Sequence, residues 1–308
     1  MDSESADWHV FRLGRAWFAG LLAGTIFGCG GTSGPTGPTP LPPGQAVAVL
    51  VGAGDIARCG AERLGAERTA SLLDGIDGTI FTAGDNAYPS GRPQDFQNCY
   101  GPTWGRHRNR TRPVPGNHEY ETAGAAGYFQ YFGDNAGPLE LGYYAYDAGP
   151  WRVLALNSEI DAGEGSAQIE WLREELRMGS SRCTAAIFHR PLFSSGPNGE
   201  NRDMIDIWRA LYDAGVDIVI NGHDHIYERF ARQTPTGQLD ALRGIRQFTV
   251  GTGGVALTGV ARPRIHSDAV ATDVHGVLKL TLAATTYQWQ FVPATQTAFQ
   301  DSGTGTCH

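Results

Sequence analysis

Hydrophobic positions along the chain predict strands that alternate with helices. Continuous apolar runs bounded by polar turns are typical of strands buried on both faces, and strands are expected at 46–53, 79–83, 112–114, 184–188 and 216–220. Helices are expected at 62–73, 96–104, 166–178 and 202–214. In the third of these helices, Ile169, Leu172 and Leu176 share one face.

The later part of the pattern predicts antiparallel strands. Two runs, 143–147 and 151–157, form an expected hairpin across Gly149-Pro150, and further strands are expected at 246–250, 276–282 and 287–292. Alternating strands and helices followed by antiparallel strands predict an α/β sandwich, in which packed sheets are flanked by helices. Nothing in the pattern indicates an internal repeat or a second domain, so residues 46–308 are expected to form one domain.

The N-terminus has the pattern of an export signal. Arg12 and Arg15 precede an apolar stretch, 16–27, that is too short to span a bilayer and suits the hydrophobic part of a signal peptide. The stretch ends in a sequence that resembles the bacterial lipobox, in which the cysteine, here Cys29, becomes lipid-modified. We therefore expect residues 1–28 to be a lipoprotein-like signal peptide. An ordinary cleaved signal and an uncleaved anchor are the alternatives.

Residues 29–45 are rich in Gly, Pro, Ser and Thr. A segment of this composition cannot bury apolar surface, so we expect it to be a flexible tether. Anchor, tether and domain together predict a protein exported to the bacterial cell envelope, in the periplasm or on the outer surface, and attached to the membrane by an N-terminal lipid.

Composition excludes one class of partner. The formal net charge is −8, and Lys279 is the only lysine. The arginines are scattered along the sequence, whereas nucleic-acid-binding surfaces carry clustered basic residues. We expect no nucleic-acid partner, and the oligomeric state stays open.

Five short polar clusters each follow an apolar run. They are Gly54-Asp55, Gly84-Asp85-Asn86-Ala87-Tyr88, Gly116-Asn117-His118-Glu119, Phe188-His189 and Gly222-His223-Asp224-His225. Each falls at the carboxyl end of an expected strand, where the ligand sites of open α/β sheets gather. Carboxylate, amide, phenol and imidazole groups are metal ligands, and two ions about 3.5–4 Å apart can promote in-line phosphoryl displacement. The clusters therefore predict a two-metal site for phosphoester hydrolysis.

These clusters resemble the calcineurin-like metallophosphoesterases and, among them, the purple acid phosphatases. The first cluster of the family is commonly Asp-x-His, but here Ala57 stands at the histidine position. Purple acid phosphatases also lack that histidine and use a tyrosine three residues after the bridging aspartate, as Tyr88 follows Asp85. The resemblance implies a four-layer α/β/β/α sandwich of the metallophosphoesterase type.

The resemblance also implies a role for each residue of the clusters. The first ion, Fe(III) in this group, would be bound by Asp55, Tyr88 and His225, and Asp85 would bridge the two ions. The second ion, Fe(II), Zn(II) or Mn(II), would be bound by Asn117, His189 and His223.

His118 would be the catalytic residue, contacting phosphate and protonating the leaving oxygen. Glu119 is expected to orient His118, with a local turn contact as the alternative. Arg190 is a candidate phosphate contact, with a packing or surface role equally open.

Setting Cys29 aside leaves four cysteines, which in an exported chain predict two disulfides with three possible pairings. Cys59 and Cys99 each lie a few residues beyond an aspartate of the clusters, so their loops should meet. We favour Cys59–Cys99 and Cys183–Cys307, with free buried thiols as the alternative.

The activity expected from the resemblance is hydrolysis of small phosphomonoesters by attack of a metal-bound hydroxide. A phosphodiesterase using the same site is one alternative. A non-catalytic surface lipoprotein that binds phosphorylated ligands is another. A third keeps the enzyme but places Zn or Mn at both positions, with Tyr88 only packing.

Overall fold

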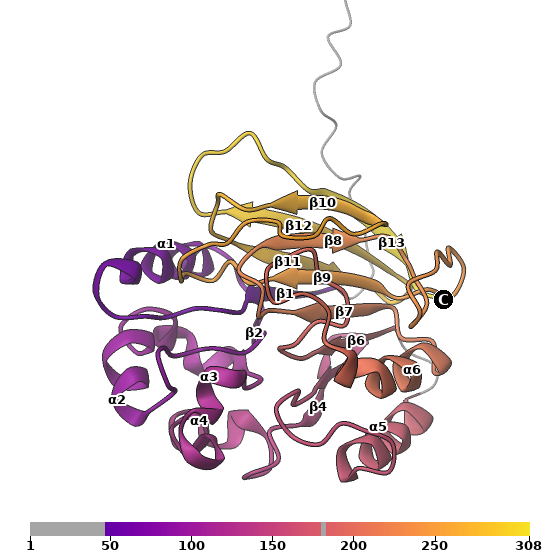
Figure 1. Ribbon diagram of the computed structural model, residues 1–308, viewed down its shortest axis with the longest axis horizontal. Helices are drawn as coiled ribbons and strands as arrows, with labels where there is room; N and C mark the ends of the chain where they lie inside the picture. Colours follow the sequence, from indigo (N-terminus) through magenta and orange to yellow (C-terminus); the bar gives the residue numbers. More distant parts are fainter. Residues whose placement is uncertain (1–46, 180–182) are drawn as a thin grey trace, which may run out of the picture. The chain divides into compact units, whose positions relative to one another are not determined.

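The computed structural model describes residues 47–179 and 183–308, which form two mixed β-sheets flanked by helices (Figure 1). All of them belong to the compact unit Gly37–His308. The expected signal peptide, Cys29 and the whole of the expected tether, 29–45, lie outside the described residues. No helix of the described part is long and apolar enough to cross a bilayer.

The first sheet is built around the first strand of the domain. Its order is β13 (Ser302–Thr306), β12 (Thr286–Pro293), β11 (Gly276–Leu282), β1 (Ala48–Ala53), β2 (Thr79–Thr82) and β3 (Thr111–Arg112). β1, β2 and β3 run parallel, while β11 pairs antiparallel with β1. The closing strands thus extend the sheet that carries the first two aspartates.

The second sheet has a parallel centre. Its order is β10 (Ser267–Ala271), β8 (Tyr227–Phe230), β9 (Arg246–Val250), β7 (Ile218–Asn221), β6 (Thr184–Ile187), β5 (Trp151–Ala155) and β4 (Tyr144–Ala148). β5, β6, β7 and β9 run parallel. The expectation of antiparallel pairing for β9 is wrong for its contact with β7 and right for its contact with β8.

Six α-helices flank the sheets in the described part of the chain. They are α1 (Arg63–Asp74), α2 (Pro93–Asp95), α3 (Asn117–Tyr120), α4 (Ala126–Phe132), α5 (Ala167–Met178) and α6 (Ile205–Asp213). The predicted helix at 96–104 is instead a single π-helical turn, Phe96–Tyr100, followed by a 3₁₀ segment, Trp104–Arg110. In Figure 1, α1 to α4 lie on the left and α5 and α6 at the lower right.

Successive side chains of the central strands point to opposite faces of the second sheet, and this explains why that sheet is covered on both sides. Val153 and Ile187 belong to a core cluster that joins both sheets and α1. The neighbouring Leu154 and Phe188 point to the other face, where they join a cluster with residues of α5 and α6 such as Trp208. Both faces of the second sheet are therefore buried, which confirms the predicted sandwich.

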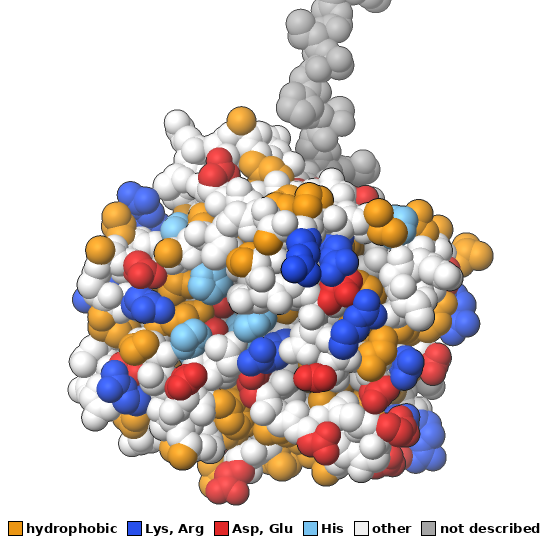
Figure 2. Space-filling view, in the orientation of Figure 1, with side chains coloured by type: hydrophobic (Ala, Val, Ile, Leu, Met, Phe, Trp, Pro, Cys, Tyr) orange, Lys and Arg blue, Asp and Glu red, His pale blue; other side chains and the backbone are white. Residues whose placement is uncertain are grey.

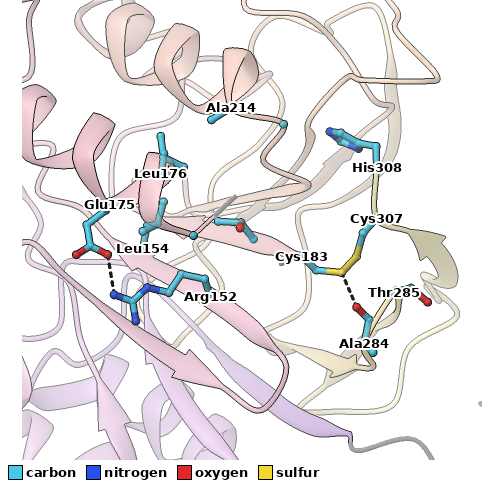
Figure 3. A pocket seen from close by; sticks show the side chains of 13 residues that line it. Arg152, Leu154, Glu175, Leu176, Cys183, Ala214, Ala284, Thr285, Cys307 and His308 are labelled. Atoms are coloured by element: carbon cyan, nitrogen blue, oxygen red, sulfur yellow. Dashed lines mark hydrogen bonds and ion pairs between the residues drawn. A yellow bond between two sulfur atoms is a disulfide. The ribbon is translucent and has the colours of Figure 1, made fainter. Parts of the chain in front are cut away.

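Two disulfides close loops of this fold, with the pairing that the sequence favoured. Cys59–Cys99 joins the loop after β1 to the π-helical turn, with 4.9 Å between the Cα atoms. Cys183–Cys307 attaches the C-terminus to the residue before β6, with 5.6 Å between the Cα atoms (Figure 3).

Candidate metal centre

Four strands deliver the aspartates and histidines expected as ligands. Asp55 and Asp85 follow β1 and β2, and His189 and His223 follow β6 and β7. Because each pair of strands is parallel and adjacent in its sheet, their carboxyl ends meet at one edge. Figure 2 shows histidine side chains gathered on the face of the molecule above this edge.

Three of these residues have strained backbones that aim them into the site. The φ angles are 60° at Asp55, 50° at Asp85 and 72° at His223. This left-handed conformation is uncommon for residues other than glycine and costs on the order of 1–3 kcal/mol each. Local contacts hold it, since the His223 amide donates to Asp55 Oδ2 at 2.8 Å and the Asp55 amide to Gly84 O at 3.0 Å.

Two glycines before ligands leave room for a ligand from another cluster. A Cβ at Gly116 would lie 2.3 Å from Asp85 Oδ1, and one at Gly222 would lie 2.6 Å from Asp55 Oδ2. Any larger residue would therefore displace a carboxylate of the site.

The first group of donor atoms surrounds the hydroxyl of Tyr88. Its Oη lies 3.0 Å from Asp55 Oδ1, 3.0 Å from Asp85 Oδ2 and 3.3 Å from His225 Nε2. His225 Nε2 also lies 3.3 Å from Asp55 Oδ1. These are the three residues expected at the first ion, together with the expected bridge.

The second group surrounds the Nε2 atom of His189. This nitrogen lies 3.1 Å from Asn117 Oδ1, 3.1 Å from His223 Nδ1 and 3.3 Å from Asp85 Oδ2. Asp85, His189 and His223 each offer a ligand atom within 4.8 Å of the others. Asp85 Oδ2 thus belongs to both groups, so the structure brings all seven expected ligands together around one shared carboxylate oxygen.

Hydrogen bonds donated by the histidine rings leave Nε2 as the nitrogen that can bind a cation. His189 Nδ1 donates to Ala83 O at 2.8 Å, and His225 Nδ1 donates to Ala256 O at 2.8 Å. A carbonyl can only accept, so in the neutral rings both Nε2 atoms carry lone pairs. These lone pairs point at carboxylate and amide oxygens, a set that fits cations and is typical of ligands oriented by outer contacts.

The charges of the site act on one another. Burial opposes ionisation of Asp85, but the adjacent rings, first that of His189, lower its pKa below the usual carboxyl range. Burial and then the charges of Asp55 and Asp85 raise the pKa of Tyr88 well above that of a free phenol. A cation among these oxygens would oppose this negative field and favour the phenolate.

His118 lies beside both groups and is accessible. Its backbone amide donates to Asp85 Oδ1 at 2.8 Å, and its Nδ1 donates to Pro89 O at 2.5 Å. The ring centroid is 4.2 Å from that of Tyr88, and Nε2 is 3.9 Å from Asp85 Oδ2. With 29% of the side chain exposed, Nε2 can exchange a proton with a bound molecule.

A family model described as calcineurin-like phosphoesterase matches residues 42–227, more than half of the chain. The chain belongs to this family. The family is a class of phosphoric ester hydrolases, and within it the chain is purple acid phosphatase-like, as two relatives in Arabidopsis thaliana indicate. Purple acid phosphatase 18 is 27% identical over 282 residues, covering 82% of this chain and 61% of that protein. Purple acid phosphatase 15 is 32% identical over 148 residues, covering 42% and 28%.

Solved structures agree on the fold. A purple acid phosphatase from yellow lupin (Lupinus luteus) seeds superposes with a TM-score of 0.70 at 19% identity, covering 87% of this chain and 55% of that chain. GAP50, described as the anchor in the inner membrane complex of Plasmodium, superposes with a TM-score of 0.66 at 14% identity, covering 85% and 89%. The matches thus span 61% of purple acid phosphatase 18, 55% of the lupin enzyme and less than a third of purple acid phosphatase 15.

Glu119 makes contacts other than the expected one with His118. Its buried carboxylate accepts hydrogen bonds from the amides of Asn86 at 2.8 Å, Ala87 at 3.1 Å and Gly116 at 2.8 Å. The ring of His118 is oriented by Pro89 instead. Glu119 therefore ties the loop of the second ligand cluster to that of the third, closer to the alternative of a local contact.

Arg190 is already paired. Its guanidinium binds the carboxylate of Glu159 through three contacts of 2.9–3.0 Å, and its amide donates to Ser158 Oγ at 3.1 Å. The structure favours a packing role for Arg190 over a phosphate contact.

Sequence reasoning missed a loop beside His223. Asn198 donates through Nδ2 to His223 O at 2.8 Å, and its amide donates to Asp224 Oδ1 at 2.9 Å. Asp224 also accepts from the hydroxyl of Ser194. Asp224 thus anchors this loop next to His223. Nothing in the sequence near Asn198 indicated the contact.

A second cluster of metal-type side chains consists of Cys183, Asp217 and Cys307. Its two sulfur atoms form a disulfide, so neither offers a thiolate. The disulfide borders a pocket of about 270 Å³ whose other wall carries the Arg152–Glu175 ion pair (Figure 3). The pocket lining includes none of the seven expected metal ligands.

Proposed function

We propose that the chain is a binuclear-metal phosphoesterase that hydrolyses small phosphomonoesters. The observation that carries the proposal is Asp85, whose Oδ2 lies 3.0 Å from Tyr88 Oη in one group and 3.3 Å from His189 Nε2 in the other. A carboxylate oxygen shared in this way suits two adjacent cations.

The two groups differ in the ions that they suit. The group of Asp55, Tyr88 and His225 carries the phenol and suits Fe(III), while that of Asn117, His189 and His223 suits Fe(II), Zn(II) or Mn(II). When bound, such a pair supplies Lewis acidity to the phosphoryl oxygens and lowers the pKa of water.

The residues of the chain orient the substrate and move the proton. Pro89 O holds the Nδ1 proton of His118, so proton exchange occurs at Nε2. The protonated ring gives this Nε2 proton to the leaving oxygen as the P–O bond breaks, and water supplies the new oxygen of phosphate. General acid catalysis of this kind contributes about 10²–10⁴ in rate.

The proposal is tested by turnover of p-nitrophenyl phosphate and bis(p-nitrophenyl) phosphate by the metal-loaded chain, with His118→Asn compared to His107→Gln. His107 is a matched control because it pairs with Asp74 at 3.1 Å and belongs to neither group. We expect monoester turnover that falls about 10²-fold or more in His118→Asn only. A strong diester preference would establish the phosphodiesterase instead.

A non-catalytic role is the other outcome of this test. GAP50 shares the fold and is described as an anchor, so the fold alone does not imply catalysis. A metal-loaded chain that binds phosphate but turns over neither ester would establish the binding role.

We also propose that the chain is exported and lipid-anchored through Cys29, with 1–28 as signal, 29–45 as tether and 46–308 as the catalytic domain. The apolar stretch and the Gly28-Cys29 pair support this proposal. The mass of the mature N-terminus tests it, because a diacylated Cys29 is expected, and an unmodified cysteine or an intact leader would contradict it.

A further inference from the structure

Arg58 lies against the metal ligands with unused hydrogen-bond donors. Its Cζ is 4.9 Å from the centroid of the Tyr88 ring. The nearest carboxylate oxygen, Glu62 Oε2, is 3.6 Å from Nε, beyond hydrogen-bond distance, and already accepts from the Ala256 amide at 3.0 Å. Nε is buried and makes no hydrogen bond with the described residues. The guanidinium can therefore accept an anionic partner.

The backbone on both sides of Arg58 is fixed to the loop that carries Tyr88. The amide of Ala57 donates to Asn86 O at 3.1 Å, and the amide of Tyr88 donates to Ala57 O at 2.8 Å. The residue after Arg58 is Cys59, which is held by the disulfide to Cys99. The backbone of the site therefore fixes where the Arg58 side chain lies over Tyr88, unlike that of a free surface arginine.

Arg190 provides the contrast. Nε and Nη2 of Arg190 donate to Glu159 at 2.9–3.0 Å, so few of its N–H groups are free to bind a phosphate. Arg58 has only a looser ion pair, with Glu62 Oε2 at 3.6 Å from Nε, and 39% of its side chain is exposed. Of these two arginines, Arg58 is the one available to a substrate.

Arg58 and His118 border the same aromatic ring. The His118 ring is 4.2 Å from the Tyr88 ring centroid and the Arg58 Cζ is 4.9 Å from it. Under the proposed function, His118 protonates the leaving oxygen, and the Arg58 guanidinium packs on the same Tyr88 ring as His118 does. A planar guanidinium matches two phosphate oxygens at once.

We propose that Arg58 binds a second phosphate on the leaving-group side, so that the site selects phosphoesters whose leaving group itself carries a phosphate. This inference rests on the proposed function. It assigns to Arg58 a role in specificity, while the metal ligands and His118 act on the phosphate that is transferred.

The test is equilibrium binding of inorganic phosphate and of methylenediphosphonate, a non-hydrolysable bisphosphonate, to the metal-loaded chain. Calorimetry gives the ratio of the two affinities, and metal content measured before and after excludes loss of ions to the bisphosphonate. The variants are Arg58→Gln, Arg58→Lys and the control Arg63→Gln, whose exposed side chain pairs with Glu67 at 2.8 Å on α1.

We expect the wild type to prefer the bisphosphonate and the preference to fall about tenfold or more in Arg58→Gln. Arg58→Lys should retain part of it, and Arg63→Gln all of it. A wild type without the preference, an Arg58→Gln variant that keeps it, or equal losses for both ligands would overturn the proposal. Equal losses are what a merely structural role through Tyr88 produces. Because binding requires no turnover, failure of catalysis would refute the proposed function and still leave the role of Arg58 measured.

Discussion

Replacing Glu119 by Gln tests how the metal centre is held in place. The Glu119 side chain is fully buried, and its Oε1 accepts from the amides of Asn86 and Ala87 at 2.8 and 3.1 Å. Its Oε2 accepts from the amide of Gly116 at 2.8 Å and from Asn86 Nδ2 at 3.4 Å. All four partners are N–H donors, so the pattern suits a carboxylate and opposes any group that itself carries an N–H.

The magnitude follows from these bonds. A glutamine can keep its oxygen toward Asn86 and Ala87, but its NH₂ group then faces the Gly116 amide, donor against donor. The change weakens two hydrogen bonds by roughly 1 kcal/mol each and leaves a buried donor unpaired at about 1–3 kcal/mol. We expect Glu119→Gln to lose about 3–5 kcal/mol of stability at the acidic end of the pH range, a fall of roughly 6–20 °C in Tm, and to retain less metal.

The assay is thermal unfolding of the metal-free chain between about pH 4.5 and pH 8, together with metal content after loading. Burial, followed by the charge of Asp85, raises the pKa of Glu119 to about 8. The folded chain therefore binds this proton more tightly than the unfolded chain, and the stability of the wild type falls as pH rises from about 4.5 to about 8. Glutamine does not titrate, so the loss in Glu119→Gln should be largest near pH 4.5 and should shrink toward pH 8.

Glu228→Gln is the matched control. Glu228 is also buried and accepts from the Ser195 amide at 2.9 Å, from Ser195 Oγ at 2.5 Å and from Ser267 Oγ at 2.6 Å. Hydroxyls can turn to accept where amides cannot, so glutamine should cost about 1 kcal/mol or less here and leave metal binding unchanged. If Glu119→Gln is as stable as Glu228→Gln near pH 4.5, the reasoning about Glu119 is refuted.

Two further predictions concern other parts of the domain. Tyr88→Phe removes the phenol oxygen of the first group and should abolish any visible tyrosinate-to-iron band. Tyr100→Phe is the control and should keep the band, because the buried hydroxyl of Tyr100 has no hydrogen-bond partner in the described residues. A band that survives in Tyr88→Phe would contradict the assignment. Burial raises the pKa of Asp217 to about 6, so the folded chain binds this proton more tightly than the unfolded chain and the stability contributed by Asp217 falls as pH rises from about 4 to about 6. Over that interval, thermal unfolding should show the stability of Asp217→Asn rising by up to about 2 kcal/mol relative to that of the wild type. The same stability difference at about pH 4 and at about pH 6 would contradict the prediction.

Strands whose residues are buried on both faces could be predicted from the sequence. β1, β2, β6 and β7 are short apolar runs. A run of this kind is typical of a strand that is buried on both faces inside a sandwich. β13 was missed because Ser302–Thr306 contains only Ser, Gly and Thr and lies at the edge of its sheet. The direction of β9 relative to β7 was missed because it depends on how the chain returns to the sheet, which no residue of β9 indicates.

The contacts that support the ligands were harder to predict than the ligands. Asp85, Tyr88 and Asn117 are indicated by residue type and spacing within short segments. The role of Glu119 depends on amides 32 and 33 residues away in sequence, and a backbone N–H carries no sequence signal. Because Glu119 is next to His118 in sequence, a contact between the two was expected. In the structure the buried carboxylate of Glu119 instead accepts hydrogen bonds from the amides of the two loops.

Backbone strain connects these contacts to the chemistry. Asp55, Asp85 and His223 have positive φ angles, a combined cost on the order of several kcal/mol that a relaxed loop would release by turning the ligands away. The amide of His223 on Asp55 at 2.8 Å and that of His118 on Asp85 at 2.8 Å prevent this, because each carboxylate is held by the backbone of another cluster. Each expected ligand is therefore positioned by the next cluster before any ion binds. It follows that a change in one cluster, such as Glu119→Gln, should weaken both of the proposed metal positions together rather than one alone.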